Sequence, residues 1–393
     1  MIPFSHATSL YAAATALDLG TFFLIALVTV LQFCFVRRHR DAARTWVKWA
    51  RYSLALFTFT LFVLCAQLII ATVYSRFADR GIEFFASEKK GLWQTRGFLD
   101  SIWQLCEAVL RVFLLVTFAM LGAGLAMARS SSSAPGTIGG AAPAGWTRTP
   151  GLAWGVGGLT LVLAVGLFGL RCYFWAHVYD ENKAHSVTAR KSRSQDGVVN
   201  LATIERATID MDFALHCIWL VLSLLVLGLA VRTRSLSRAA PHTITASKHF
   251  LTCAVLFVAQ PLYNIIISII FRLVSSSVSG VEATIVTDVV FRTWPYALIL
   301  VVLFVLGRRK IGGVWSTQQP FQTKDAAAGE TVYQTPWGYQ VTHQTAPPQA
   351  PVYDSQAQLN DYYAQPPQQG AQEGQHHQHQ QYHQHQQQQP HYG

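Results

Sequence analysis

Residues 284–310, which read TIVTDVVFRTWPYALILVVLFVLGRRK, constrain the fold of this chain more than any other stretch. From residue 284 to residue 306 the stretch is apolar and long enough to cross a bilayer as a helix, which needs roughly 20 residues. It ends in Arg308, Arg309 and Lys310, a basic flank that is typical of the cytoplasmic side of a membrane span. The stretch therefore predicts a transmembrane helix.

Six earlier stretches have the same character, so the chain as a whole is predicted to be a polytopic membrane protein. Hydrophobic residues make up 51% of the sequence and charged residues only 13%, whereas a soluble domain carries about 25% charged residues. We predict an all-α fold, a seven-helix transmembrane bundle within residues 1–311. The expected spans are residues 19–36, 52–74, 102–127, 152–170, 211–231, 250–271 and 284–306.

The distribution of basic residues predicts how the bundle is oriented. The loop of residues 37–51 holds six Lys or Arg against the single acid Asp41, and such loops stay in the cytoplasm. This places the N-terminus outside and the C-terminus in the cytoplasm, most simply in the plasma membrane. The net charge is +10, but its basic residues lie between apolar stretches, which favours a lipid bilayer over nucleic acid as the partner.

The polar tail, residues 312–393, has a different composition from the bundle. It is rich in Gln, Pro, His and Tyr, and it ends in the low-complexity run QHHQHQQYHQHQQQQPHYG. Such a segment has too little apolar surface to fold alone, so we predict a disordered cytoplasmic tail. Its recurring tyrosines allow adaptor docking or weak self-association as alternatives to a purely solvated segment.

Several polar residues fall inside the predicted spans, and almost all of them lie in the outer halves. A charge at membrane depth costs about 2.5–3.5 kcal/mol, so it usually faces a partner or a water-filled cavity. The pattern predicts an outward-facing polar vestibule between the third, fifth, sixth and seventh spans that binds a small ligand. The candidate ligand-binding residues are Glu107, Arg111, Asp212, His216, Asn264, Asp288 and Arg292.

The alternative to a ligand pocket is local neutralisation. Glu107 and Arg111 are four residues apart, as are Asp288 and Arg292, and residues at this spacing share one face of a helix. Each couple could form an ion pair within its own helix near the headgroups. A charge-neutral substitution of Asp288 or Arg292 separates these two readings through ligand response and surface abundance.

No motif in the sequence indicates an enzyme. We identify no catalytic residue, no metal site and no cofactor, although a membrane metal hydrolase remains an alternative. A catalytic metal would need three protein ligands and an open position, but no compact ligand motif is present. The residues that could supply such ligands are Asp210, Asp212, His216, His177 and His185.

Two cysteines and two prolines carry further expectations. Cys106 and Cys172 both lie toward the predicted outer side, where a disulfide can form, with buried free thiols as the alternative. Pro261 and Pro295 lie within the sixth and seventh spans. Because proline removes a backbone hydrogen bond and tends to kink a helix, both are hinge candidates, with static shaping of the bundle as the alternative.

The layout resembles that of G-protein-coupled receptors over about residues 15–310. The common features are seven spans, an outside N-terminus, a basic first inner loop, prolines in the sixth and seventh spans and a long inner tail. With its Ser/Gly-rich loop and its Gln/Pro/Tyr-rich tail, the chain also resembles receptor-like seven-helix membrane proteins of filamentous fungi. The third span ends GLAMARS and the seventh contains Trp294-Pro295-Tyr296, so the resemblance is one of layout and assigns no individual residue.

The resemblance implies a receptor-like protein that signals to a G protein or to an adaptor bound to its tail. The seventh span contains no lysine, which excludes a retinal Schiff base like that of microbial rhodopsins. A transporter or channel is the first alternative, because the same charges could line a path. A non-catalytic membrane organiser that recruits partners through its tail is the second.

Overall fold

The computed structural model confirms the seven-helix membrane architecture. It describes residues 6–36, 41–79, 86–132, 144–188, 201–238, 243–273, 285–309, 313–315, 330–334 and 340–344. Within these residues, seven helices are long and apolar enough to cross a membrane. Each coincides with a predicted span and most extend beyond it, since the helices continue past the roughly 20 residues that a bilayer core requires.

The elements follow one another along the chain with short connections. They are α1 (His6–Phe35), η1 (Ala42–Arg44), α2 (Trp46–Asp79), α3 (Ala86–Ser132), α4 (Ala144–Thr188), α5 (Leu201–Ser237), α6 (Ile244–Leu273), η3 (Val289–Thr293), α8 (Trp294–Arg308), β1 (Glu330–Gln334) and β2 (Gln340–Gln344). The seventh span, Ile285–Arg308, contains both η3 and α8.

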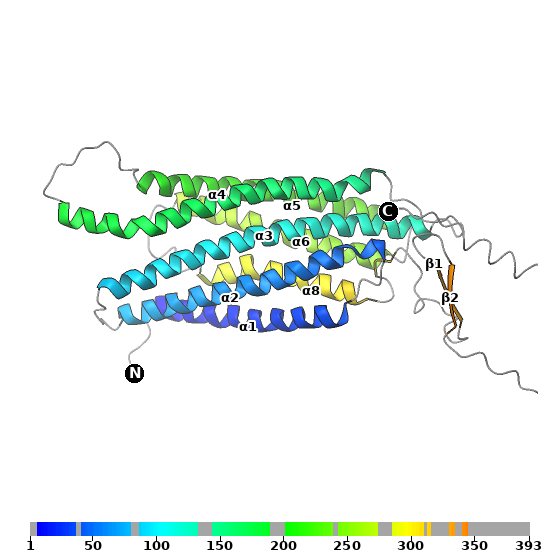
Figure 1. The fold of residues 1–393 in the computed structure, drawn as a ribbon, viewed down its shortest axis with the longest axis horizontal. Coiled ribbons are helices and arrows are strands. Elements are labelled where there is room, and N and C mark those ends of the chain that lie inside the picture. The colour runs from blue at the N-terminus through cyan, green and yellow to red at the C-terminus, as the bar shows by residue number, and fades with distance from the viewer. Residues whose placement is uncertain are drawn as a thin grey trace, which may run out of the picture.

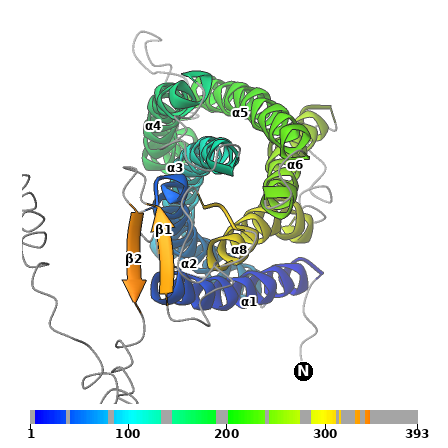
Figure 2. The ribbon, with the colours of Figure 1, turned by 90° about the vertical axis from the view of Figure 1, so that its right-hand side faces the viewer.

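The helices lie side by side in one bundle with α3 at its centre. Figure 1 shows them running along a common direction, and Figure 2 shows the other helices surrounding α3. Along α3, the side chains of Leu110, Leu114, Phe118 and Leu121 are all fully buried. The outer helices instead expose large apolar side chains, for example Leu159 of α4. Such an apolar outer surface suits lipid, where every backbone group must be bonded within its own helix.

We name the two ends of the bundle by the chain. The N-terminal end is where α1 begins, and the C-terminal end is where α8 ends. Hydroxyl pairs show that α2 runs antiparallel to α1: Thr15 Oγ1 lies 3.2 Å from Thr72 Oγ1, and Thr29 Oγ1 lies 2.8 Å from Thr58 Oγ1. Such interhelical hydrogen bonds and van der Waals packing hold helices together in lipid, where hydrophobic burial supplies little driving force.

The seventh span is not a uniform α-helix. Residues Val289–Thr293 form a π-helical turn, η3, in which the backbone N–H of Trp294 donates to the carbonyl of Val289. Pro295 follows directly, and in a continuous α-helix its ring would clash with the carbonyl of the residue four positions earlier. The wider turn relieves that contact. It also changes the direction of the side chains in this turn, which matters for Arg292 below.

The C-terminal end is closed by a short return of the chain. After α8, the side chains of Val314 and Trp315 are buried against the bundle. The guanidinium of Arg44 lies 4.0 Å from the centre of the Trp315 ring, and its Nη2 donates to the carbonyl oxygen of Gly307. Arg44 thus joins η1, α8 and the chain that follows α8, through a cation–π contact and a charge-assisted hydrogen bond.

Gly124 lets α3 pack closely against η1 at this end, and it offers a test of the packing. A methyl group at Gly124 would overlap the carbonyl oxygen of Ala43, which is backbone and cannot rotate away. We expect Gly124→Ala to destabilise the protein by about 1–3 kcal/mol, the usual cost of overpacking. The measurement is unfolding by denaturing detergent in mixed micelles.

The matched control is Gly158→Ala on α4, where an added methyl group meets nothing within 4 Å. Because alanine favours helices over glycine by up to about 1 kcal/mol, this variant should be neutral or slightly stabilised. Equal losses at the two glycines would contradict the close approach of α3 and η1.

The tail contains one feature that the sequence analysis did not predict. Strands β1 and β2 form an antiparallel pair in which Glu330 faces Gln344 and Val332 faces Thr342. In Figure 1 the pair is drawn beyond the C-terminal end of the bundle. Apart from these strands and residues 313–315, the predicted disordered tail lies outside the described residues.

Candidate functional site

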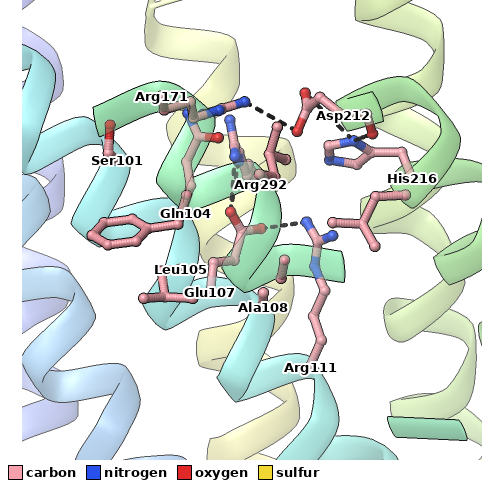
Figure 3. Close-up of a pocket in the computed structure, with 14 residues that line it drawn as sticks. Ser101, Gln104, Leu105, Glu107, Ala108, Arg111, Arg171, Asp212, His216 and Arg292 are labelled. Atoms are coloured by element: carbon pink, nitrogen blue, oxygen red, sulfur yellow. Dashed lines mark hydrogen bonds and ion pairs between the residues drawn. The ribbon is translucent and has the colours of Figure 1, made fainter. Parts of the chain in front are cut away.

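A buried carboxylate, Glu107 of α3, is the centre of a polar network inside the bundle. Arg111 Nη2 donates to Glu107 Oε1 at 2.6 Å, and Gln260 Nε2 donates to the same oxygen at 2.8 Å. Arg292 donates to Oε2 from Nη2 at 2.8 Å and from Nε at 3.2 Å. Tyr296 accepts from Arg111 Nε at 2.8 Å and lies 3.3 Å from Oε1. Figure 3 shows both guanidiniums converging on the one carboxylate.

The network joins three helices at one point. Glu107 and Arg111 belong to α3, Gln260 to α6, and Arg292 and Tyr296 to the seventh span. Glu107 and Arg111 are each only 4% exposed. A buried charge of this kind is tolerated only with paired, hydrogen-bonded partners. Two guanidiniums around one carboxylate leave a local excess of one positive charge.

The structure confirms one of the two local ion pairs and corrects the other. Glu107 and Arg111 do pair within α3. Arg292, however, pairs with Glu107 across the bundle, and Asp288 Oδ1 instead accepts a hydrogen bond of 2.6 Å from Tyr263. The π-helical turn explains this difference, because its i→i+5 geometry means that residues four apart no longer lie one above the other.

A second polar layer lies toward the N-terminal end of the bundle. Arg171 of α4 lies 3.1 Å from Asp212 Oδ1 on α5 and 3.8 Å from Asp100 Oδ2 on α3. Asp100 also accepts hydrogen bonds from Gln67 at 3.1 Å and from Gln104 at 2.8 Å. These contacts connect α2, α3, α4 and α5, so the polar residues of this half form an interhelical framework.

His216 is the least satisfied member of the predicted set. Its Nδ1 lies 2.8 Å from the backbone oxygen of Asp212 and 3.7 Å from the carboxylate oxygen Oδ2 of the same residue. Its Nε2 is buried and has no hydrogen-bond partner among the described residues. The histidine is therefore held in place by Asp212 while its other ring nitrogen remains available.

Two cavities lie on either side of Arg292. The first has a volume of about 30 Å³ and is lined by Glu107, Arg111, Arg171, Asp212 and His216 among others. A volume of this size is close to the share of one water molecule, so it is too small for an organic ligand. The second has a volume of about 220 Å³.

The second cavity lies between α1, α2, α3 and the start of the seventh span. Its polar lining consists of Tyr11, Asp18, Gln67, Arg96, Asp100, Gln104, Asp288, Arg292 and Thr293. Arg292 lines both cavities and also binds Glu107. A change in the second cavity therefore reaches the central network through a single side chain.

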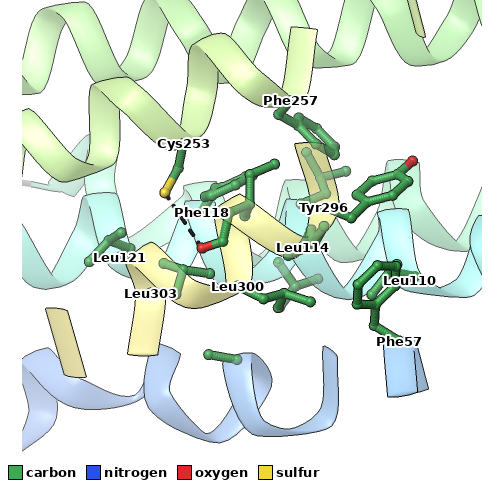
Figure 4. Close-up of a cluster of buried hydrophobic side chains, with 14 of the residues drawn as sticks. Phe57, Leu110, Leu114, Phe118, Leu121, Cys253, Phe257, Tyr296, Leu300 and Leu303 are labelled. Atoms are coloured by element: carbon green, nitrogen blue, oxygen red, sulfur yellow. Dashed lines mark hydrogen bonds between the residues drawn. The ribbon is translucent and has the colours of Figure 1, made fainter. Parts of the chain in front are cut away.

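Apolar side chains close the bundle on the C-terminal side of the network. Phe118 of α3 packs against Phe257 of α6 with ring centres 5.2 Å apart, and Phe57 of α2 packs against Tyr296 at 6.0 Å. Leu300 and Leu303 of α8 are also buried in this layer. Figure 4 shows these residues gathered between the helices, and we call them the apolar floor. The polar chamber is therefore blind toward the C-terminal end.

The predicted site residues do not all meet. Glu107, Arg111, Asp212, His216 and Arg292 line the first cavity, and Asp288 lines the second. Asn264 is buried, its Nδ2 has no hydrogen-bond partner among the described residues, and it lines neither of these cavities. The vestibule also has walls that were not predicted, since α1, α2 and α4 contribute to it.

The analysis of the sequence missed several residues of the chamber. Asp18 was placed before the first span, but α1 begins at His6, so Asp18 lies well inside the helix. The helix-favouring run of alanines at residues 12–16 was the available signal. Tyr296 was noted only as part of a Trp-Pro-Tyr sequence, because a tyrosine in an apolar span gives no indication that its hydroxyl meets an arginine.

The disulfide alternative is wrong in this structure, since Cys106 and Cys172 are both free thiols. No group of three or more His, Cys, Asp or Glu residues within the described part of the chain is placed to hold a metal ion. His185 lies outside the residues whose side chains are described. Pro261 lies within α6 and directly follows Gln260, while Pro295 directly precedes Tyr296.

Comparison with known proteins adds no family to these observations. The chain matches no family model, no curated protein and no solved structure. The functional argument therefore rests on the chamber, the network and the floor.

Proposed function

We propose that this membrane protein is receptor-like: it binds a small ligand in the polar chamber and transmits the event to the opposite end of the bundle. The blind shape of the chamber carries this proposal. A transporter needs a path with polar groups on both sides of its site, whereas here the apolar floor follows directly after the network. In this proposal the N-terminal end faces outward, in the plasma membrane, and the C-terminal end faces the cytoplasm.

The network supplies a physical route for transmission. A ligand in the second cavity contacts Arg292, whose guanidinium is bound to Glu107. Glu107 in turn holds Gln260 on α6 and lies beside Tyr296 on α8. Each of these residues adjoins a proline, Pro261 or Pro295, where a helix lacks a backbone hydrogen bond and bends most easily. Rearrangement at Glu107 would therefore move α6 and α8 about these prolines.

A distance measurement without any ligand tests this proposal. Spin labels are attached at Lys48 of α2 and Lys248 of α6, both exposed at the C-terminal end, after replacement of the exposed Cys34 by serine. We expect Gln260→Leu, which removes the hydrogen bond between α6 and Glu107, to add a second population to the Lys48–Lys248 distance distribution. Such a bond to a charged group contributes about 1.5–3 kcal/mol, enough to shift a two-state equilibrium about 10-fold or more.

The control is a second pair of labels at Lys48 and Ser235 on α5, because α5 makes no hydrogen bond to Glu107 among those described. This distance should not change. If Gln260→Leu leaves both distances unchanged, the network is a static brace and the receptor-like proposal fails.

The proposed partner is a G protein or an adaptor bound to the tail, as the layout implies. We expect a heterotrimeric G-protein α subunit to co-purify with the gently solubilised protein and to be released by guanine nucleotide. Retention of a partner only when residues 312–393 are present would instead favour a tail-binding adaptor.

A further inference from the structure

We propose that the second cavity binds a small organic cation, a protonated amine, between the carboxylates of Asp18 and Asp288. This inference deepens the proposed function, on which it depends only for the signalling role of the ligand. The binding site itself is argued from the lining of the cavity.

Asp18 is the strongest observation. Its side chain is only 1% exposed and lines the cavity, and its Oδ1 atom has no hydrogen-bond partner within the described parts of the chain. Thr293 lies within hydrogen-bonding reach of the same carboxyl group. A buried acidic oxygen without a donor is costly. A ligand that donates hydrogen bonds and carries positive charge would satisfy it.

The remaining charges of the cavity are already committed elsewhere. Asp100 lies near Arg171 and accepts hydrogen bonds from Gln67 and Gln104. Arg292 binds Glu107 and stacks at 4.0 Å over the ring of Trp103.

The last guanidinium of the lining, that of Arg96, is directed to α1. Its Nη2 donates to the hydroxyl of Tyr11 at 3.4 Å, and it stacks 5.6 Å from the ring centre of that residue. Its charge is therefore directed to the outer part of the cavity.

Asp18 and Asp288 remain as two acidic side chains that interact unfavourably with each other. The only neutral donor described for Asp288 here is the hydroxyl of Tyr263, at 2.6 Å. A second buried acceptor without a described partner, Gln67 Oε1, lines the same cavity. A cation placed between these groups removes the repulsion and supplies the missing donors, which an anion or a neutral apolar molecule cannot do.

The size and the apolar part of the lining indicate an organic cation rather than a bare metal ion. A volume of about 220 Å³ equals the share of about seven water molecules. The described residues supply no cluster of three or more metal-ligating side chains. Leu64, Leu68, Ile285 and Val289 form an apolar wall of the cavity, against which a short hydrocarbon group can pack.

The experiment uses the full-length protein in nanodiscs of phosphatidylcholine and isothermal titration calorimetry. The probes are butylammonium and 2-phenylethylammonium, and the comparison compounds are butanol and butyrate. We expect the ammonium probes to bind and the two comparison compounds to bind at least tenfold more weakly. Equal binding of butanol and butylammonium, or binding of none of the four, overturns the proposal.

The variant that tests the site is Asp18→Asn, and the matched control is Asp210→Asn at an exposed position on α5 that lines neither cavity. Loss of one partner from a buried charge pair predicts at least about thirtyfold weaker ammonium binding for Asp18→Asn. The control should bind as the wild type does. Unchanged affinity of a folded Asp18→Asn protein overturns the proposal. If this variant does not fold, the preference of the wild-type protein for the ammonium probes decides.

The outcomes also separate this inference from the proposed function. Ammonium binding without any change in the Lys48–Lys248 distance would retain the cation site and overturn the signalling role. A distance change in Gln260→Leu without ammonium binding would retain the signalling role and overturn the cation site.

Discussion

Replacement of Glu107 by glutamine is expected to destabilise the bundle by about 3–5 kcal/mol, the usual cost of removing one partner from a buried ionic group. The amide can accept hydrogen bonds, but it carries no charge to balance Arg111 and Arg292. Both guanidiniums would then be buried without a counter-charge between α3 and the seventh span. The free energy of unfolding can be measured by titration with denaturing detergent in mixed micelles.

Two further variants make the Glu107 experiment specific. Glu205→Gln changes the same charge at an exposed position of α5, and we expect it to alter stability by less than about 0.5 kcal/mol. The double variant Glu107→Gln with Arg292→Gln removes one of the two unbalanced cations, so it should recover part of the loss. A loss below about 1 kcal/mol for Glu107→Gln alone would show that the network contributes little to stability.

Replacement of Phe118 by alanine should have the second-largest effect, a loss of about 3 kcal/mol. Phe118 is fully buried in the apolar floor and packs against Phe250 and Phe257 of α6, with ring centres 6.0 and 5.2 Å away. In lipid the unfolded side chain is already in an apolar medium, so the loss comes mainly from the cavity that remains and the missing dispersion contacts. The same detergent titration measures it.

The control for Phe118 is Phe59→Ala on α2, a ring that is 51% exposed on the outside of the bundle. Its removal leaves no internal cavity, and we expect less than about 1 kcal/mol. Similar losses for the two phenylalanines would contradict a tightly packed floor. The floor also matters for function, because it closes the polar chamber toward the C-terminal end.

The apolar floor and the polar chamber differ in how readily they follow from the sequence. The floor is built from ordinary apolar residues of the third, sixth and seventh spans, and the sequence shows only that these stretches are apolar. Nothing in it distinguishes Phe118, which is buried at the centre, from Phe59, which is exposed. That difference depends on α3 lying in the middle of the bundle, a consequence of packing among all seven helices.

The seven spans and the concentration of polar residues in one half of the bundle followed from the sequence by itself. Length and hydropathy determine them locally, because a bilayer of fixed thickness demands about 20 apolar residues and makes every charge within them costly. The spacing of Glu107 and Arg111 was likewise sufficient to predict their ion pair, since both lie in an uninterrupted helix.

Only the tertiary structure decided which charges meet. Arg292 binds Glu107 rather than Asp288 because a π-helical turn before Pro295 redirects its side chain and because the seventh span lies beside α3. Asp18 enters the chamber because α1 packs against α2 and the seventh span. Partners 185 residues apart, as Glu107 and Arg292 are, are brought together by helix packing, which no local pattern in the chain encodes.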